Sequence, residues 1–413
     1  MIYANICVFL LCLHVICSLA MSNENNAHDT AAIKFKLLHL TDTHGWINGH
    51  PHNPELNADF GDLYNFIHHL KTLSDKNAEE FLVLDTGDLI EGTGLSDATP
   101  IHGQDIYPIA QQIPYDAMGI GNHDLGHVDS VKLMEESIIS SLGEKFVTTN
   151  TFDDDTGRHL GSCYYNINLE SGYKVLILGF IYNFDQNVET TAIVYMEQVV
   201  QSSCFQQAIE QQDIDLIVSL NHIDPQSQND TLRIQYNAIR DKHKYTPFIM
   251  LAGHRHVLYY EEYDANCFTM ESGKYFEVMG IIEFNLQRDQ YGNAYWTNLS
   301  HRYINTSLTL MYKETQTNKD TFATDIGISI SKQIKTYYDK LGLSKQIGCN
   351  AHTLNPYVPL NDPSSFYYVY INDVVAGNFN PLDDKKGMIS FFITNSAALR
   401  DYLYNGDQVL NDM

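Results

Sequence analysis

Short apolar runs alternate with amphipathic segments along most of this chain. The apolar runs have the length of buried strands and lie at Phe35–Leu40, Phe81–Leu84, Ala117–Ile120, Lys174–Phe180, Leu216–Leu220 and Phe248–Leu251. Apolar residues recur at helical spacing in Asp62–Leu73, Ser130–Leu142, Cys204–Gln211 and Leu232–Lys242. Strands separated by helices predict parallel β-α-β units, and therefore an α/β fold whose sheets are covered on their faces.

The pattern changes after Cys267. Two longer extended segments, Tyr275–Leu286 and Ala294–Tyr303, are expected to close a first domain at residues 32–310. The polar stretch Thr315–Thr324 has no clear period and marks a linker within residues 311–325. An amphipathic helix is expected from Asp325 to Leu341, at the start of a second domain of α+β type at residues 326–413. A length of 413 residues agrees with more than one domain.

The N-terminal segment has the pattern of a secretory signal peptide. Residues 6–20 form an uncharged apolar run that is short for a membrane span, and Ser18-Leu19-Ala20 has the small side chains of a cleavage site. A membrane anchor or a buried first strand is the alternative. We expect a signal peptide at residues 1–20, a disordered polar segment at 21–31 and no membrane span after cleavage. The polar C-terminus argues against a GPI anchor.

Cysteines and glycosylation sequons agree with passage through the secretory pathway to the cell exterior, cell wall or vacuole. Four cysteines follow the predicted signal peptide, namely Cys163, Cys204, Cys267 and Cys349. They allow one or two disulfides, whose pairing the sequence does not decide. Three sequons begin at Asn229, Asn298 and Asn305, so a glycoprotein is expected.

The charge balance narrows the possible partners. The chain has 51 acidic and 25 basic residues, which give a formal net charge of −26. Nucleic-acid binding is not expected, because it needs basic patches that displace counterions from phosphates. A phosphate substrate would also be repelled at long range, so metals or a few placed cations must supply local positive charge.

Five short polar boxes follow apolar runs in order along the chain. They are Asp42-Thr43-His44, Gly87-Asp88, Gly121-Asn122-His123-Asp124, Asn221-His222 and Gly253-His254-Arg255-His256. In α/β folds, ligands bind beyond the carboxyl ends of the strands, so we expect the boxes to meet at one site. Solvated turns are the structural alternative for any single box. Together the carboxylate, amide and imidazole donors are enough for two divalent ions, and donors of this mix accept zinc, manganese, iron or cobalt.

In this order the boxes resemble those of the calcineurin-like metallophosphoesterases, enzymes with two metals that hydrolyse phosphate esters. The resemblance covers about residues 36–286 and implies a four-layer α/β/β/α sandwich. It implies a bridging role for Asp88 and a charge-stabilising role for the His123 imidazole at the phosphoryl or leaving group. The implied ligands are Asp42, His44 and His256 for the first metal, and Asn122, His222 and His254 for the second.

Other strings resemble the 5′-nucleotidase branch of that superfamily, in particular its secreted fungal members. These strings are Thr41–Gly45, Phe60–Leu63, Glu271–Tyr275, Ile347–Cys349 and Asn395–Arg400. The last one resembles a segment that helps to form the substrate pocket, which makes Asn395 and Arg400 candidate substrate contacts. The fork of donors on Arg400 suits a phosphate, and a surface arginine at a turn is the alternative.

Two departures from the branch affect the prediction. The branch places an acid three residues after the catalytic histidine, but that position is Gly126 here. Asp124 is the nearest acid and is taken as a catalytic residue, with loop stabilisation as the alternative. The chain also ends soon after Arg400, so the second domain is expected to be partial. Phe391, Phe392, Tyr402 and Tyr404 are candidates to stack a base, or else they pack in the core.

The sequence therefore predicts a secreted hydrolase of small phosphate esters, and the resemblance to the 5′-nucleotidase branch implies nucleotides as the substrates. A general phosphomonoesterase or phosphodiesterase of the same superfamily is the second reading. A third reading, of another class, is a non-catalytic metal-binding protein descended from such an enzyme. Four more histidines lie in loops near the boxes and are expected to be solvated, with substrate contact as the alternative: His50, His52, His102 and His127.

Overall fold

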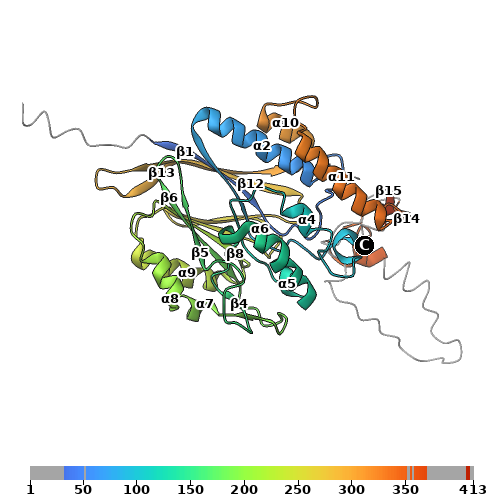
Figure 1. Ribbon diagram of the computed structural model, residues 1–413. Helices are drawn as coiled ribbons and strands as arrows, with labels where there is room; N and C mark the ends of the chain where they lie inside the picture. The colour runs from blue at the N-terminus through green and yellow to red at the C-terminus, as the bar shows by residue number, and fades with distance from the viewer. Residues whose placement is uncertain (1–31, 51–52, 351–353, 356–357, 370–405, 410–413) are drawn as a thin grey trace, which may run out of the picture.

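The computed structural model describes residues 32–50, 53–350, 354–355, 358–369 and 406–409. Two sheets stack face to face, and helices cover their outer faces (Figure 1). This four-layer α/β/β/α arrangement confirms the predicted fold class. The predicted signal peptide, the polar segment 21–31, Asn395, Arg400 and the four C-terminal aromatic residues lie outside the described residues.

The first sheet has the strand order β13-β12-β1-β2-β3, and the second has the order β10-β11-β9-β8-β6-β5. The strands of the first sheet are β1 (Ile33–Leu40), β2 (Glu79–Asp85), β3 (Ala117–Met118), β12 (Val278–Arg288) and β13 (Ala294–Asn305). Those of the second are β5 (Tyr164–Asn168), β6 (Lys174–Ile181), β8 (Leu216–His222), β9 (Phe248–Ala252), β10 (Leu258–Asp264) and β11 (Cys267–Ser272). Two small antiparallel pairs join β4 (Thr151–Asp153) to β7 (Thr191–Ile193) and β14 (Gln346–Asn350) to β15 (Gly406–Val409).

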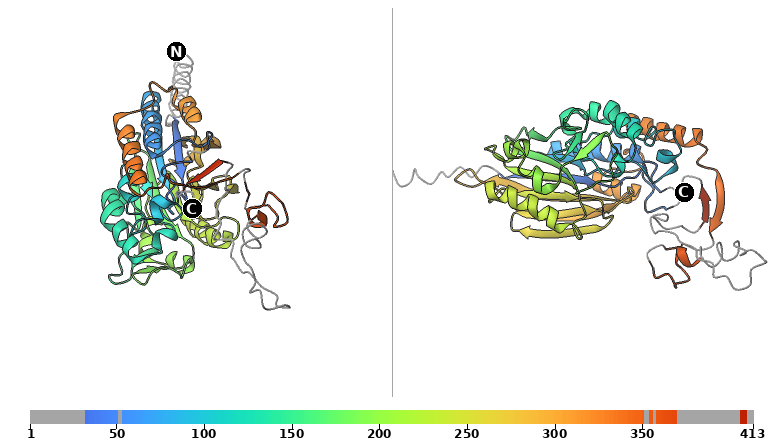
Figure 2. Two further views of the ribbon diagram at one scale, coloured as in Figure 1. Left: turned by 90° about the vertical axis from the view of Figure 1, so that its right-hand side faces the viewer. Right: turned by 90° about the horizontal axis from the view of Figure 1, so that it is seen from below.

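Helices connect most of these strands. The α-helices are α2 (Phe60–Asn77), α3 (Gly94–Asp97), α4 (Tyr107–Ala110), α5 (Val128–Met134), α6 (Ser140–Leu142), α7 (Met196–Val199), α8 (Ser203–Ile209), α9 (Asn229–Lys242), α10 (Leu308–Thr315), α11 (Asp325–Lys340) and α12 (Phe366–Val369). A π-helical turn, η2 (Glu135–Ile139), lies between α5 and α6, and 3-10 turns lie at η1 (His123–Leu125) and η3 (Gly143–Lys145). In the view from below, β14 and α12 lie beyond the end of the sandwich (Figure 2, right).

Alternating side chains of the central strands fill separate hydrophobic layers. In β9, Ile249 packs into the layer between the two sheets, whereas its neighbour Met250 packs under α8 and α9. In β1, Leu37 faces the other sheet and Leu38 faces α2. Because successive side chains of a strand point to opposite faces, a continuous apolar run supplies both layers at once. This explains why the strands are uninterrupted hydrophobic segments in the sequence.

Helix α11 packs closely on α2. An ideal Cβ on Gly327 would lie 2.6 Å from the carbonyl oxygen of Gly61, so the helices cross at small residues. Ile330 and Ile334 are fully buried in the core beneath α2, and the Ser331 hydroxyl donates to Asp59 at 2.8 Å. Helix α11 therefore packs against the first domain, although the sequence analysis placed it at the start of the second.

Two further boundaries differ from the expectations. The segment predicted as a linker at 311–325 begins inside α10, which ends at Thr315. The extended segment predicted from Tyr275 becomes a strand only at Val278, because Tyr275 and Phe276 have φ angles of 55° and 54°. Left-handed residues turn the chain, so these two positions form a turn before β12.

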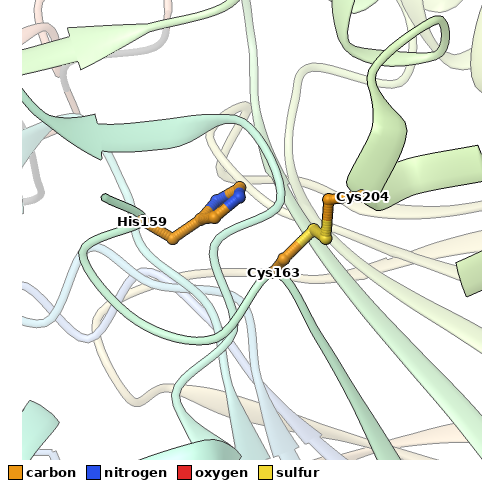
Figure 3. Close-up of side chains that lie close together, drawn as sticks. All are labelled: His159, Cys163 and Cys204. Carbon is orange, nitrogen blue, oxygen red and sulfur yellow. A yellow bond between two sulfur atoms is a disulfide. The ribbon is translucent and has the colours of Figure 1, made fainter. Parts of the chain in front are cut away.

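One disulfide joins Cys163, just before β5, to Cys204 in α8, with the His159 ring nearby (Figure 3). The sequence had left the pairing open. The sulfur atoms are bonded to each other, so this trio is not available as a metal site. Cys267 is a free, buried thiol, and burial raises its pKa.

Candidate metal centre

All five polar boxes lie where strands of the two sheets end. Parallel pairing aligns β1, β2 and β3 in one sheet and β6, β8 and β9 in the other. Their carboxyl ends therefore meet at one edge of the sandwich, as the sequence predicts. The residues brought there are Asp42 and His44 after β1, Asp88 after β2, Asn122 and His123 after β3, His222 at the end of β8, and His254 and His256 after β9.

Several of these residues have a left-handed backbone. The φ angle is 49° at Asp42, 48° at His44, 57° at Asp88, 81° at His254 and 67° at His256. Such conformations cost about 1–3 kcal/mol each in residues other than glycine and persist only when the surroundings impose them. Hydrogen bonds between the first two loops do so here, since the Asp42 and His44 N–H groups donate to the Gly87 and Asp88 carbonyls at 2.9 Å.

Asp42, His44 and His256 form the first compact group of donors. His256 Nε2 lies 3.2 Å from Asp42 Oδ1 and 3.1 Å from His44 Nε2. One donor atom from each of the three residues lies within 4.8 Å of the other two. Asp42 and His44 are fully buried, while a quarter of the His256 side chain is exposed. The set that the resemblance implied for the first metal is thus close together.

Asp88, His222 and His254 form the second group, with donor atoms again within 4.8 Å of one another. Asn122 Oδ1 lies 3.2 Å from His222 Nε2 and adds an amide oxygen. Asp88 Oδ2 lies 3.1 Å from His222 Nε2 and 3.5 Å from His44 Nε2. This carboxylate oxygen therefore faces both groups, as a bridging ligand must.

Backbone carbonyls orient two of the imidazoles. His44 Nδ1 donates to the Glu91 carbonyl at 2.6 Å, and His222 Nδ1 donates to the Thr86 carbonyl at 3.1 Å. When Nδ1 carries the proton and donates, Nε2 keeps its lone pair for the centre. Carbonyl partners of this kind are typical around metal-binding histidines.

The electrostatics of the centre also favour a cation. Burial disfavours ionisation of both Asp88 and His222, but their mutual attraction outweighs it. This attraction lowers the pKa of Asp88 well below its usual value and raises the pKa of His222 to about 10. The buried Asp88 Oδ2 is also left without a hydrogen bond of good geometry from the described residues. Nitrogen and oxygen donors around an under-satisfied carboxylate fit divalent transition metals.

His123 lies beside the centre, and its acidic partner is Glu91. His123 Nδ1 is 2.6 Å from Glu91 Oε2, and the His123 ring meets the His44 ring edge to face at 4.8 Å. Burial raises the pKa of Glu91, but the hydrogen bond to His123 outweighs it and lowers the pKa below its usual value. The sequence analysis missed Glu91, which belongs to no motif. Like five residues of the two donor groups, it has a left-handed backbone, with a φ of 64°.

Asp124 has a different position from the one predicted. Its buried carboxylate accepts backbone N–H groups of Asp88 at 2.9 Å, Leu89 at 3.0 Å and Gly121 at 3.0 Å. These bonds tie the second loop to the third, so the alternative role of loop stabilisation agrees with the geometry. Both carboxylate oxygens are thus occupied by backbone donors, and the partner of His123 comes from another loop.

Among the remaining loop histidines, His127 is exposed as predicted, whereas His50 and His102 are less solvated than expected. His50 is buried and donates to the Tyr275 carbonyl at 2.8 Å. His102 and His127 lie beside Glu91. His52 lies outside the described residues.

Comparisons with known proteins identify the family. The pattern of the calcineurin-like phosphoesterase family matches residues 35–282. An uncharacterized protein of Schizosaccharomyces pombe is 29% identical and covers 90% of this chain. A protein of Arthroderma benhamiae described as a secreted protein is 27% identical and covers 92%. The chain spans 66% and 63% of the lengths of these two curated relatives.

Solved structures show a related architecture. The crystal structure of 5′-nucleotidase from Candida albicans superposes with a TM-score of 0.82 at 25% identity, over 93% of this chain and 72% of that chain. A 5′-nucleotidase precursor from Thermus thermophilus has a TM-score of 0.62 at 14% identity, over 92% and 73% of the two chains. The second likeness concerns the fold alone. On its sequence pattern, its fold and its clustered donors, this chain belongs to the calcineurin-like phosphoesterase family.

Proposed function

We propose that the chain is a secreted phosphoesterase that uses two divalent ions to hydrolyse nucleotide phosphomonoesters. The observation that carries the proposal is the convergence on Asp88 of six other nitrogen and oxygen donors, beside an imidazole that already has an acidic partner. A set of metal donors beside such an imidazole–carboxylate pair fits phosphoryl transfer to water better than it fits a structural metal site. A structural metal site is closed by its ligands and needs no neighbouring acid–base pair.

The ligand sets proposed from the sequence agree with the distances between the donors. Asp42, His44 and His256 would hold one ion, His222, His254 and Asn122 the other, and Asp88 both. Bound there, the ions supply Lewis-acid chemistry, which polarises a phosphoryl group and makes water a better nucleophile near neutral pH. The native metals are proposed to be among zinc, manganese, iron and cobalt.

His123 is proposed to stabilise the charge that develops on the phosphoryl or leaving oxygen. The Glu91 carboxylate accepts a hydrogen bond from Nδ1, which orients the ring. An imidazolium beside a developing negative charge lowers the barrier because it is already oriented before the reaction. His123 is not proposed as a metal ligand, although one of its ring nitrogens lies within 4.8 Å of donor atoms of His44 and Asp88.

The nucleotide part of the proposal rests on similarity. It is supported by the likeness to the Candida albicans 5′-nucleotidase over 93% of the chain. The proposed substrate contacts, Asn395 and Arg400, lie outside the described residues. A general phosphomonoesterase or a phosphodiesterase would use the same metal centre and differ in what surrounds the substrate.

Secretion is proposed from four observations. The N-terminal pattern is that of a signal peptide, and a relative from Arthroderma benhamiae is described as a secreted protein. The Cys163–Cys204 disulfide suits an oxidising compartment, and the sequon residues Asn298 and Asn305 are exposed. Within the described part of the chain, no helix has the length and apolar character needed to cross a membrane.

The test is phosphate release by residues 21–413, secreted from a eukaryotic host and supplied with manganese, cobalt or zinc. AMP, a simple aryl phosphate and a bis-ester are compared, with His123→Asn as the matched variant. Metal-dependent release that is fastest with AMP and lowered in His123→Asn supports the proposal. Preference for the aryl phosphate or the bis-ester removes the nucleotide claim. No release from any ester by a chain that binds metal overturns the catalytic proposal.

A further inference from the structure

A further cluster of potential metal donors, Glu91, His102 and His127, lies outside the two groups of the metal centre. Glu91 Oε1 is 3.2 Å from His102 Nδ1 and 3.0 Å from His127 Nε2. The two imidazole rings meet edge to face with their centres 4.4 Å apart. One donor atom from each of the three residues lies within 4.8 Å of the other two. None of the five polar boxes contains any of these residues.

The two distances from Glu91 Oε1 are those expected between ligand atoms around one ion. Two ligand atoms about 2.0–2.1 Å from a tetrahedral zinc ion are about 3.3 Å apart. The two distances from Glu91 Oε1 to the histidines are within a few tenths of an ångström of that value. Two histidines and one carboxylate are also a set that zinc binds with a position left open. We propose that Glu91, His102 and His127 form a third divalent-metal site, of zinc type, separate from the two-metal centre.

The site is accessible from solvent. A cavity of about 240 Å³ is lined by His102 and His127 together with Ile101, Val128 and Asp129. The His127 side chain is 53% exposed, the His102 side chain 31% and the Glu91 side chain 19%. An ion can therefore enter without opening the fold, and water can complete its coordination.

Glu91 connects this site to the catalytic histidine. Its Oε1 faces His102 and His127, while its Oε2 accepts from His123. One carboxylate thus serves two groups through different oxygens. The competing account is an ion-pair network in which both histidines donate to Glu91 and no ion is involved. The two accounts differ in the number of ions that the protein binds.

The experiment counts zinc. Wild type (residues 21–413) and His102→Ala/His127→Ala are dialysed against buffered free zinc, and the bound metal is measured by mass spectrometry. We expect wild type to bind one ion more than the double variant, whose apparent Kd for that ion rises at least about tenfold. In crystals, anomalous scattering at the zinc edge should place the additional ion among Glu91, His102 and His127.

His68→Ala/His301→Ala is the matched control, because it removes two exposed histidines distant in sequence from Glu91, His102 and His127. It should bind as much zinc as wild type. Equal zinc content in wild type and His102→Ala/His127→Ala overturns the third site. Retention of the other ions by the double variant shows that it is folded. The count does not depend on turnover, so a failure of the proposed esterase activity leaves this result interpretable.

Discussion

Glu91 and His123 come from loops after different strands, yet Glu91 Oε2 lies 2.6 Å from His123 Nδ1. The branch that the chain resembles places the acid three residues after the histidine, where this chain has Gly126. An ideal Cβ on Gly126 would lie 3.3 Å from Glu91 Oε1. The Glu91 carboxylate therefore occupies the space into which a side chain at position 126 would extend. The same pairing is achieved here from another loop.

Glu91→Gln is expected to lower kcat by about 10²-fold while the two-metal centre keeps its ions. The amide cannot stabilise a protonated His123 as the carboxylate does, and groups of this kind contribute about 10²–10⁴-fold. The measurements are steady-state kinetics and metal content. Because a purely structural role would also disturb KM and stability, an unchanged KM with a lower kcat identifies the positioning role.

A relocated acid supplies the control. Glu91→Ala removes the carboxylate and vacates the space beside Gly126, whose backbone is right-handed with a φ of −78°. The kcat of Glu91→Ala/Gly126→Asp should then be at least about tenfold higher than that of Glu91→Ala. This increase is only a small part of the rate contribution that such groups make. If the double variant is no faster than Glu91→Ala, with both folded, the carboxylate does not act by pairing with His123.

Asp88→Asn is expected to remove both ions and to abolish turnover. Asp88 Oδ2 faces both donor groups, and an amide supplies neither the negative charge nor the same bridging capacity. The direct measurement is metal content by mass spectrometry, with Asp97→Asn as a control from the same loop region. Full metal content with full activity would show that Asp88 is not the bridging ligand.

The acidic pair that caps α2 predicts a pH-dependent stability. Asp59 and Asp62 form a capping box, and burial together with the charge of Asp59 raises the pKa of Asp62 to about 7. In the folded protein Asp62 keeps a proton that the unfolded chain releases above about pH 4. The pair therefore contributes most to folding stability at low pH. Stability should fall as pH rises from about 4 to 7, by about 1.4 kcal/mol per unit at most.

Asp62→Asn keeps an acceptor for the Asp59 N–H but cannot ionise. The difference in unfolding free energy between Asp62→Asn and wild type should therefore increase from pH 4 to pH 7. Chemical denaturation at a series of pH values, at constant metal concentration, measures this difference. Asp75→Asn changes an exposed acid of the same helix and serves as the reference. A difference that stays constant with pH would contradict the assignment.

The disulfide should contribute measurably to stability. It closes a loop of 41 residues, for which the chain-entropy relation gives about 4 kcal/mol, and measured values usually fall between about 2 and 4 kcal/mol. Cys163→Ala/Cys204→Ala should therefore lower the free energy of unfolding by about 2–4 kcal/mol. A reducing agent should destabilise wild type but not the double variant. Equal sensitivity of the two proteins would show that the bond does not form in the secreted protein.

The sequence predicted those elements of the fold that have a regular pattern of apolar residues. The strands and helices of the sandwich were recognisable because β9 and its neighbours are continuous apolar runs and α2 and α9 have helical spacing. The metal-centre residues were recognisable because each follows such a run. Their proximity then follows from parallel strands, whose ends share one edge.

The parts that were missed depend on contacts between distant segments. Glu91 is separated from His123 by 32 residues and belongs to no recurring pattern, so only folding brings them together. The same is true of Cys163 and Cys204. Asp124 was misplaced because adjacency in sequence suggested a contact with His123, whereas the loop turns its carboxylate toward three backbone N–H groups.

The contact of α11 with α2 sets the size of the smallest fragment that folds. A fragment that ends where the strands end, near residue 305, would leave the apolar surface that Phe322, Ile330 and Ile334 cover open to water. Exposed surface of that kind promotes aggregation. An autonomous catalytic fragment must therefore continue at least through α11 to Leu343, which is the last fully buried apolar residue of that core among the residues that the structure describes.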